Sequence, residues 1–162
     1  MQIRPATEAD IPVLRDLAQR IWRECYTGII AVEQIEFMLG WMYSEEEIRR
    51  QLAAGVPWGI AELEGEPVGY LSWQQEEDGR VKVSKLYVLP QRQRRGLGRQ
   101  MLEHICEQSR AVGAHAVWLQ VNKRNERAIS AYLRAGFHIE REAVFDIGGG
   151  FVMDDYLMAR SV

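Results

Sequence analysis

One short segment, Gln93-Arg94-Arg95-Gly96-Leu97-Gly98, constrains the fold more than any other part of the chain. An apolar run over Val83–Leu89 precedes it and ends at Pro90, which predicts a buried strand. After the segment, apolar residues recur with the spacing of a helix; they are Leu97, Met101, Leu102, Ile105 and Cys106. The pattern therefore predicts a strand, a tight loop and a helix in direct succession.

The predicted junction has the chemistry of an anion site. The first turn of a helix leaves N–H groups without partners and carries the positive end of the helix dipole. Gly96 and Gly98 allow the backbone to turn sharply or to approach a ligand closely. Guanidinium groups surround the same point; they belong to Arg92, Arg94, Arg95 and Arg99. Together these features predict a cradle for a phosphate or pyrophosphate group.

Two other interpretations of the basic segment stay open. One is a solvated basic turn, although positive charge at a helix N-terminus is unfavourable without an anion. The other is a nucleic-acid phosphate site. The basic run is short, the net charge of the chain is −3, and no nucleic-acid module pattern is present. We therefore expect no nucleic-acid partner.

Composition predicts one domain over residues 1–162 with an ordinary apolar core. No apolar run is long enough for a membrane span, and the N-terminal residues lack the pattern of a signal peptide. We therefore expect a cytoplasmic protein with reduced Cys25 and Cys106, the latter packed in the core. The histidines lack metal-ligand spacing, so no metal site is expected. Acidic residues predominate in residues 1–79 and basic residues in 80–162, which indicates either different partners for the two halves or simply different solvated faces.

The rest of the sequence predicts an α/β protein with a mixed sheet (α+β) in the order β-αα-βββ-α-β-α-ββ. Thr7 and Asp10 have capping-box spacing before the first helix. The expected helices cover 11–21, 32–42, 44–52, 96–112 and a stretch from Asn125 to Gly136. The expected strands cover a short stretch at Ile3, then 58–63, 68–73, 81–89, 116–121, 137–145 and 151–158.

These motifs resemble those of the GCN5-related N-acetyltransferases (GNAT), strongly over residues 83–137 and in element order elsewhere. The residues that carry the resemblance are Leu86-Tyr87-Val88-Leu89-Pro90, Gln93-x-x-Gly96-x-Gly98, Asn125, Ala128, Tyr132 and Gly136-Phe137. The resemblance implies an acetyl-CoA-dependent N-acetyltransferase that acts on a primary amine (a polyamine, another small amine or a peptide amine). It also implies splayed central strands, and it makes a homodimer an expected assembly. A CoA-binding sensor module without turnover is the alternative.

The resemblance implies which residues hold acetyl-CoA. The pantetheine is expected to add to the strand end at Leu86, Tyr87 and Val88, unless that segment is an ordinary buried strand. The pyrophosphate is expected on the loop residues; they are Gln93, Arg94, Arg95, Gly96, Leu97, Gly98 and Arg99. Asn125 is expected to contact the pantetheine, although it is also a good helix N-cap.

Tyr132 and Val88 are the catalytic residues that the resemblance implies. Tyr132 is expected to protonate the departing thiolate, with a core aromatic as its alternative, and the Val88 N–H is expected to stabilise the oxyanion. Relatives often carry a glutamate where this chain has Val83-Ser84-Lys85, so the general base is not assigned. The candidates are Glu24, Glu76, Glu77 or a chain of water molecules.

The acceptor side is expected in the first helices and the final hairpin. The helices supply an aromatic and methionine-rich zone, most of it core; it comprises Trp22, Tyr26, Phe37, Met38, Trp41, Met42 and Tyr43. Asp154 and Asp155 are neighbours in a strand, so at least one should point away from solvent and invite a cation, unless both are edge-strand charges. A weaker likeness to bacterial spermine/spermidine acetyltransferases adds polyamines to the expected acceptors.

Overall fold

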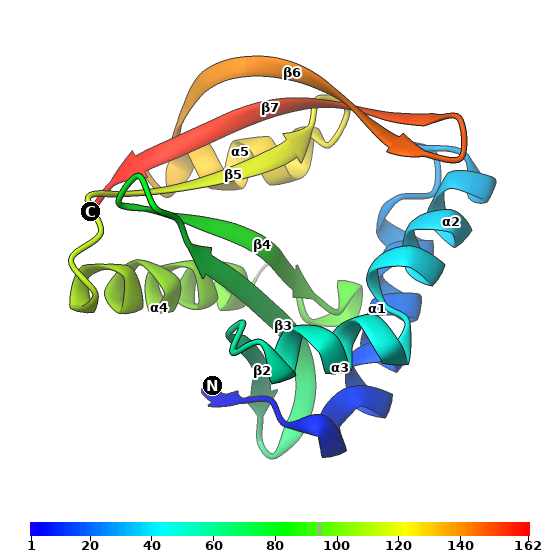
Figure 1. Cartoon of the computed structure of the whole chain (residues 1–162), viewed down its shortest axis with the longest axis horizontal. Coiled ribbons are helices and arrows are strands. Elements are labelled where there is room, and N and C mark those ends of the chain that lie inside the picture. Colours follow the sequence, from blue (N-terminus) through cyan, green and yellow to red (C-terminus); the bar gives the residue numbers. More distant parts are fainter. Residues whose placement is uncertain (94) are drawn as a thin grey trace. The chain divides into compact units, whose positions relative to one another are not determined.

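The computed structural model describes residues 1–93 and 95–162 (Figure 1). Within these residues the helices are α1 (Ile11–Cys25), α2 (Val32–Met42), α3 (Glu45–Ala53), α4 (Leu97–Ala111) and α5 (Glu126–Arg134). The strands are β1 (Gln2–Pro5), β2 (Trp58–Leu63), β3 (Glu66–Gln75), β4 (Arg80–Val88), β5 (Ala116–Asn122), β6 (His138–Gly148) and β7 (Phe151–Ser161). The strands form a mixed sheet in the order β1-β2-β3-β4-β5-β7-β6, and this confirms the predicted fold class.

The chain forms two compact units, and each is described by itself. The first unit comprises Met1–Trp73 and Lys85–Met101, and the second comprises Gln74–Ser84 and Leu102–Val162. Strand β4 and helix α4 each contribute residues to both units. The expectation of a single domain over residues 1–162 stays a prediction.

In the first unit, the antiparallel strands β1, β2 and β3 adjoin a cluster of helices that precedes β2 in the sequence. Helix α1 buries one face because apolar residues recur every three or four positions along it. These buried residues are Ile11, Leu14, Leu17, Ala18, Ile21 and Trp22. Pro12 sits in the first turn of α1, where a missing N–H costs nothing.

Three α-helices lie between β1 and β2, which confirms the three helical ranges predicted there, although the predicted element order gave only two. The third is α3, which follows α2 after a break of two residues. Ser44 explains the break, because its side chain accepts a hydrogen bond from the Glu47 N–H at 3.1 Å and so caps a new helix.

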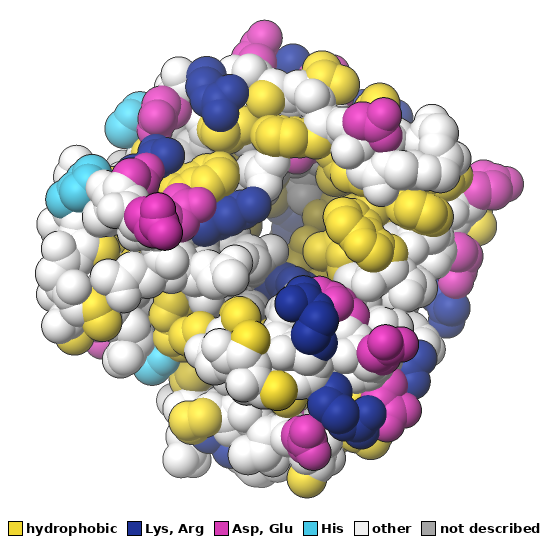
Figure 2. Space-filling view, viewed as in Figure 1, with side chains coloured by type: hydrophobic (Ala, Val, Ile, Leu, Met, Phe, Trp, Pro, Cys, Tyr) yellow, Lys and Arg dark blue, Asp and Glu magenta, His cyan; other side chains and the backbone are white. Residues whose placement is uncertain are grey.

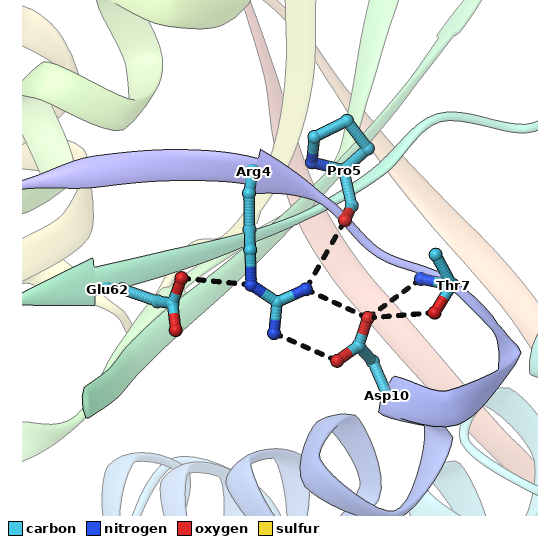
Figure 3. Close-up of polar contacts among 5 residues, drawn as sticks. All are labelled: Arg4, Pro5, Thr7, Asp10 and Glu62. Atoms are coloured by element: carbon cyan, nitrogen blue, oxygen red, sulfur yellow. Dashed lines mark hydrogen bonds and ion pairs between the residues drawn. The ribbon is translucent and has the colours of Figure 1, made fainter. Parts of the chain in front are cut away.

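A charged network in the first unit joins β1, β2 and the start of α1 (Figure 3). Arg4 donates to both carboxylate oxygens of Asp10 at 2.9 Å and to Glu62 at 2.9 Å. Asp10 also accepts from the Thr7 N–H at 2.8 Å, so the predicted capping-box contact of Asp10 with Thr7 is confirmed. Asp10 is buried, and Arg4 is the main reason that the pKa of its carboxyl lies below the usual 3.8. The network therefore holds the N-terminal strand to the first helix.

In the second unit, the residues Arg80–Val83 of β4 pair with Ala116–Leu119 of β5 in parallel, and β7 pairs antiparallel with both β5 and β6. The part of α4 in this unit buries Leu102, Ile105 and Cys106, so the prediction that Cys106 packs in the core is confirmed. The ion pair of Glu103 with Arg160, at 2.6 Å, links α4 to β7.

The ends of the predicted elements agree with the observed ones to within a few residues. Helix α4 ends before Gly113 and α5 before Gly136, and both glycines have positive φ, at +77° and +89°. This backbone conformation disfavours a side chain, which is why glycine ends a helix. The final hairpin is longer than predicted, because β6 and β7 continue to Gly148 and from Phe151.

Charges of both signs mix on the molecular surface, although they separate along the sequence. Figure 2 shows basic and acidic side chains interspersed over the face that it draws. Several are paired, as in Arg23 with Glu36 at 2.9 Å and Arg50 with Glu47 at 2.6 Å. Both pairs lie within residues 1–79 and are largely exposed, so each contributes little to stability. Both interpretations of the uneven sequence charge stay open.

Among the described residues, no helix is both long and apolar enough to cross a membrane. The same residues contain no group of three or more His, Cys, Asp or Glu side chains placed to hold a metal ion.

Replacement of Asp10 by asparagine is expected to destabilise the protein by about 1–3 kcal/mol at pH 7, because Arg4 then loses its buried carboxylate partner. The pKa of Asp10 is lowered from 3.8, so its carboxylate stabilises the folded state above that pH. The destabilisation should shrink as the pH falls below 3.8 and through the lowered pKa. Urea unfolding of both proteins over this pH range measures the effect.

The matched control is Asp16→Asn, because Asp16 pairs with Arg20 at 3.4 Å on the exposed face of α1. Exposed pairs contribute little, so this change should cost under about 0.5 kcal/mol. Equal losses in the two variants would show that the Asp10 network does not stabilise the fold.

Replacement of Gly69 by alanine is expected to destabilise the protein by about 1–3 kcal/mol. A Cβ atom at Gly69 would clash with the Tyr87 carbonyl oxygen and lie 3.3 Å from the Val88 Cα, so the backbone of β3 or β4 must move. In contrast, a Cβ at Gly40 in α2 meets nothing within 4 Å. Gly40→Ala should therefore stabilise by up to about 1 kcal/mol, because alanine favours helix. Urea unfolding of both variants tests the contrast, and a neutral Gly69→Ala would contradict it.

Candidate functional site

The segment that joins β4 to α4 has the predicted strand–loop–helix form. Strand β4 ends at Val88, a short 3-10 turn covers Pro90–Arg92, and α4 begins at Leu97. Leu97 is only 5% exposed, so its side chain anchors the first turn of the helix in the core of the first unit. The loop before it is thereby held at the helix N-terminus.

The two loop glycines serve different purposes. Gly96 has φ of +74°, a conformation that disfavours side chains, so the turn itself requires glycine here. Gly98 needs no such freedom, and a Cβ there would meet only the Val88 Cγ2, at 4.0 Å. Neither packing nor backbone strain explains why position 98 lacks a side chain. A ligand that approaches the backbone closely would explain it.

The start of α4 presents donors and positive charge together. An α-helix leaves its first N–H groups without intrahelical partners, and here these belong to Leu97, Gly98 and Arg99. Arg95, Gly96 and Arg99 are exposed. The helix dipole adds to the positive potential at this point. These features suit a bound anion, as the sequence predicted.

Two loop residues have partners that the sequence did not reveal. The Gln93 N–H donates to the Pro90 carbonyl at 3.3 Å, so this amide is engaged in the 3-10 turn. Arg92 forms an ion pair with Glu66 at 3.7 Å. Arg94, predicted to lie near the anion, is outside the described residues. Among the described residues, the candidate anion cradle thus comprises residues 95–99.

The side chain of Gln93 connects the loop to the end of β4. Its Nε2 donates to the Val88 carbonyl at 3.0 Å and contacts the Cys25 Sγ at 3.6 Å. Val88 is buried, at 7% exposure. The amide of Gln93 thus sets where the carbonyl of Val88 points, and with it the peptide plane at the strand end. No periodicity or motif in the sequence indicates this contact.

The last residues of β4 lie beyond its described pairing with β5. That parallel register runs from Arg80↔Ala116 to Val83↔Leu119, and it does not include Leu86, Tyr87 or Val88. The other neighbour approaches closely, because Gly69 of β3 lies against the Tyr87 carbonyl and the Leu89 N–H donates to the Val68 carbonyl at 2.8 Å.

Aromatic side chains surround the end of β4 within the first unit. The Tyr87 hydroxyl lies 3.2 Å from that of Tyr26, and the Tyr43 hydroxyl accepts from Tyr70 at 2.8 Å and from Trp22 Nε1 at 3.1 Å. Burial raises the pKa of Tyr70 and of Tyr87 well above 10. These phenols are therefore neutral at physiological pH and act through hydrogen bonds.

The predicted aromatic and methionine-rich zone is largely core. Four of its residues are buried, and these are Trp22, Tyr26, Met38 and Tyr43. Phe37 and Met42 are half-buried, whereas Trp41 is 52% exposed. Only the last three have surface to offer to an acceptor.

The predicted base candidates have unequal environments. Glu24 and Glu77 are exposed, and the half-buried Glu76 accepts a hydrogen bond from Trp118 Nε1. Lys85 belongs to the stretch Val83–Lys85, where relatives often carry a glutamate. It is 5% exposed, and its Nζ lies 4.8 Å from the centroid of the Trp58 ring. This is the geometry of a cation–π contact.

Asn125 and Tyr132 belong to helix α5 in the second unit. The Asn125 side chain accepts from the Ala128 N–H at 3.3 Å, so it is the N-cap of α5. Tyr132 is half-buried, its ring centroid lies 6.1 Å from that of Phe137, and its carbonyl accepts from the Phe137 N–H at 3.0 Å. The phenol is therefore not a fully buried core group.

The two aspartates of β7 have opposite environments, as strand alternation predicted. Asp154 is exposed and pairs with Lys123 at 2.9 Å. Asp155 is 4% exposed, and burial, reinforced by Asp154, raises the pKa of its carboxyl to about 6. Its Oδ1 is buried and has no hydrogen-bond partner among the described residues.

Comparison with known proteins places the chain in a family. The model of the acetyltransferase (GNAT) family matches residues 15–137. An uncharacterized N-acetyltransferase of Mycobacterium bovis is 33% identical over 102 residues, which cover 63% of this chain and 65% of that protein. The match thus spans slightly less than two thirds of the relative.

Two solved structures share the fold. One is the PaiA N-acetyltransferase of Thermoplasma acidophilum in complex with coenzyme A, with a TM-score of 0.86 and 21% identity over 99% of this chain and 98% of that one. The other is a chimera of the spermidine N-acetyltransferase SpeG of Vibrio cholerae and hSSAT, with a TM-score of 0.74 and 16% identity over 99% of this chain and 96% of that one. Because the family model covers most of the sequence, including the loop before α4, the chain belongs to the acetyltransferase (GNAT) family.

Proposed function

We propose that this protein is an acetyl-CoA-dependent N-acetyltransferase that moves an acetyl group to a primary amine. The observation that carries the proposal is Gly98, whose missing side chain has no explanation in packing or backbone strain. It lies in the first turn of α4, between the exposed Arg95 and Arg99. Membership of the acetyltransferase family and the coenzyme A complex of a structural neighbour support the same ligand.

In this proposal the diphosphate of acetyl-CoA binds at the N-terminus of α4. Main-chain N–H groups from Gly96 to Arg99 donate to its oxygens, and Arg95 and Arg99 neutralise its charge. Gln93 and Arg94 stay in the proposed set from the resemblance. Gln93 acts through its contact with Val88, since its own N–H is engaged with Pro90.

The pantetheine is proposed to add to the end of β4 as a ligand strand. Main-chain groups of Leu86, Tyr87 and Val88 lie beyond the described register with β5, which supports this placement. Asn125 is assigned to the same moiety by the family resemblance. Its Oδ1 accepts from the Ala128 N–H, so the proposed contact uses the Nδ2 donors.

The chemistry consists of one acyl exchange. The neutral amine nitrogen attacks the thioester carbonyl carbon and an N–C bond forms. The nitrogen, now positively charged, gives up one proton to water, the C–S bond breaks and the thiolate leaves with CoA. The Val88 N–H donates to the oxyanion that develops on the carbonyl oxygen. The Tyr132 hydroxyl gives its proton to the leaving sulfur, since a phenol and a thiolate have comparable basicity. The assignment of Tyr132 rests on its order after Asn125 and before Gly136 in the family motif.

The attacking amine must first lose a proton, because an alkylammonium has a reference pKa of about 10.4. Glu24, Glu76, Glu77 and a chain of water molecules remain the candidates for the base. Glu76 already accepts the Trp118 indole N–H, and Glu24 and Glu77 are exposed, so a water-mediated path is favoured.

The remaining assignments are predictions. The acceptor is a polyamine, another small amine or a peptide amine, and the likeness of fold to a spermidine N-acetyltransferase supports the first of these. A cytoplasmic location and a homodimer are likewise predicted. The second candidate function is a CoA-binding sensor without turnover, favoured by the lack of a glutamate in Val83–Lys85, where relatives often carry one.

Replacement of Gly98 by glutamate is expected to abolish acetyl-CoA binding without unfolding the protein. A Cβ atom at position 98 would meet only the Val88 Cγ2, at 4.0 Å, so the backbone tolerates a side chain there, whereas the bulk and charge of glutamate would occupy the proposed diphosphate position. Isothermal titration should show at least a hundredfold weaker acetyl-CoA affinity at an unchanged melting temperature. Gly96→Glu is a less clean variant, because φ of +74° at Gly96 strains any side chain.

The matched control is Gln108→Glu, which adds the same charge at an exposed position of α4 ten residues further along. It should bind acetyl-CoA as tightly as the wild-type protein. Normal affinity of Gly98→Glu would refute the diphosphate site. Tight binding by the wild-type protein, with no consumption of acetyl-CoA on a broad panel of amines, would favour the sensor function.

Tyr132→Phe is expected to lower kcat by about a hundredfold or more while the dissociation constant of acetyl-CoA stays within twofold. The phenol acts only when the thiolate leaves, so its loss slows turnover more than it weakens binding. Steady-state kinetics together with isothermal titration separate the two quantities. Tyr156→Phe on β7 makes the same chemical change and should leave kcat unaltered; an equal effect in both variants, or none in Tyr132→Phe, would remove the acid assignment.

A further inference from the structure

Asp155 lies in the interior of the sheet in the second unit. It is paired with Asn122 of β5 on one side and with Ala143 of β6 on the other. Directly opposed residues of antiparallel strands point to the same face. Asp155 therefore shares a face with Asn122 and, further along β5 and at alternate positions, with Gln120 and Trp118.

The carboxylate of Asp155 is incompletely satisfied. Its side chain is among the buried polar groups, and Oδ1 has no hydrogen-bond donor among the described residues. Burial of an ionised carboxylate without a donor is costly, so proteins normally pair such groups. The position therefore invites a ligand that brings both a positive charge and N–H donors.

Three charged groups act on Asp155 electrostatically, namely Asp154, Lys82 and Lys123, and both lysines also have other contacts. Lys123 pairs with Asp154 at 2.9 Å and with Glu142 at 3.5 Å. Lys82 places its Nζ 5.0 Å from the centroid of the Trp118 ring. Both cations lower the pKa of Asp155 and Asp154 raises it, but burial dominates, so the net direction is upward, to about 6. None of the ion pairs among the described residues includes Asp155.

We propose that Asp155 binds a primary ammonium group of the acceptor, one that stays protonated while a second amine of the same molecule is acetylated. The proposal rests on the proposed acetyltransferase function and names its substrate class: an acceptor with two alkylammonium groups. Asp155 is thus a specificity residue that distinguishes such acceptors from those with a single amine.

The chemistry of Asp155 favours the non-reacting ammonium over the reacting amine. A carboxylate stabilises the charged form of a neighbouring amine, whereas the attacking amine must be neutral. Proton transfer from an alkylammonium of reference pKa about 10.4 to a carboxylate whose pKa is about 6 is unfavourable by roughly ten-thousandfold. The carboxylate is therefore better suited to hold a proton-bearing ammonium than to remove its proton.

Direct binding tests the assignment without any need for turnover. The probes are 1,4-diaminobutane and butylamine, titrated calorimetrically into the wild-type protein, Asp155→Asn and Asp154→Asn. The two variants remove the same charge from neighbouring residues, one buried and one exposed. We expect the wild-type protein and Asp154→Asn to prefer the diamine at least tenfold, and Asp155→Asn to lose that preference. Melting temperatures of both variants check that the fold is retained.

The pH dependence of diamine affinity provides a second test. A purely structural role of Asp155 would not make this affinity rise near the pKa of its carboxyl. The diamine keeps both charges from pH 5 to pH 8, so only the protein titrates. Affinity of the wild-type protein for the diamine should rise as the pH passes about 6 and Asp155 ionises, and this rise should be absent in Asp155→Asn. The dipeptide alanyl-lysine amide also carries two ammonium groups. If the dipeptide binds and the diamine does not, and if this binding depends on Asp155, the acceptor with two ammonium groups is a peptide.

Each outcome decides between the proposals. Equal affinities of the wild-type protein and Asp155→Asn, or no preference for either two-ammonium probe over butylamine, would overturn the role of Asp155 and leave the acetyltransferase proposal standing. Diamine binding that depends on Asp155, in a protein that neither binds nor consumes acetyl-CoA, would overturn the proposed function and leave a diamine site. In an active enzyme, Asp155→Asn should raise KM for the diamine at least tenfold with kcat within twofold.

Discussion

The passage from β4 into α4 is the constraint on which the candidate site depends. Within eight residues the chain leaves a strand at Val88, makes a 3-10 turn and enters a helix at Leu97. The positive φ of Gly96 makes the last turn, and the burial of Leu97 anchors the helix start. The Gln93 amide holds the Val88 carbonyl across the loop at 3.0 Å. Strand end and helix start are therefore coupled, and a ligand that contacts one is aligned with the other.

Positive charge gathers at the N-terminus of α4. Exposed guanidinium groups at the N-terminus of a helix repel the positive end of the helix dipole, so Arg95 and Arg99 are unfavourably placed unless an anion joins them. Gly98 also leaves its backbone exposed to a ligand, although the space beside it would accept the Cβ of a side chain. A diphosphate satisfies both features at once, and the matching of the acetyltransferase (GNAT) family over residues 15–137 is consistent with that ligand.

The second unit contains a buried acidic group, which is opposite in charge to the helix terminus of the first unit. Asp155 is a buried carboxylate whose Oδ1 has no hydrogen-bond partner among the described residues, whereas the adjacent Asp154 is exposed and paired with Lys123. Strand alternation separates the two environments, because neighbours in a strand face opposite sides. One chain thus combines a cationic helix terminus with a buried anionic position. These two features match the anionic cosubstrate and the cationic acceptor that we propose.

The sequence by itself determined the fold class, the order of the strands along the chain, the ends of α4 and α5, the capping by Asp10 and Asn125, and the location of the glycine-containing loop. These features are local: they follow from apolar period, from glycine and proline, and from side chains that bond to backbone a few residues away. It also indicated that one of two adjacent aspartates is buried, since alternation is a local property of a strand.

Only the tertiary structure decided which aspartate that is and what its carboxylate lacks, because its burial depends on strands distant in the sequence. The same holds for the Gln93–Val88 contact, the cation–π position of Lys85 and the need for glycine at position 69, each of which joins segments that no periodicity relates. The separation of α2 from α3 was also predicted from the sequence, since the Ser44 cap marks a new helix between the ranges 32–42 and 44–52. Local chemistry thus specified the elements, and packing between distant segments specified the partners of their side chains.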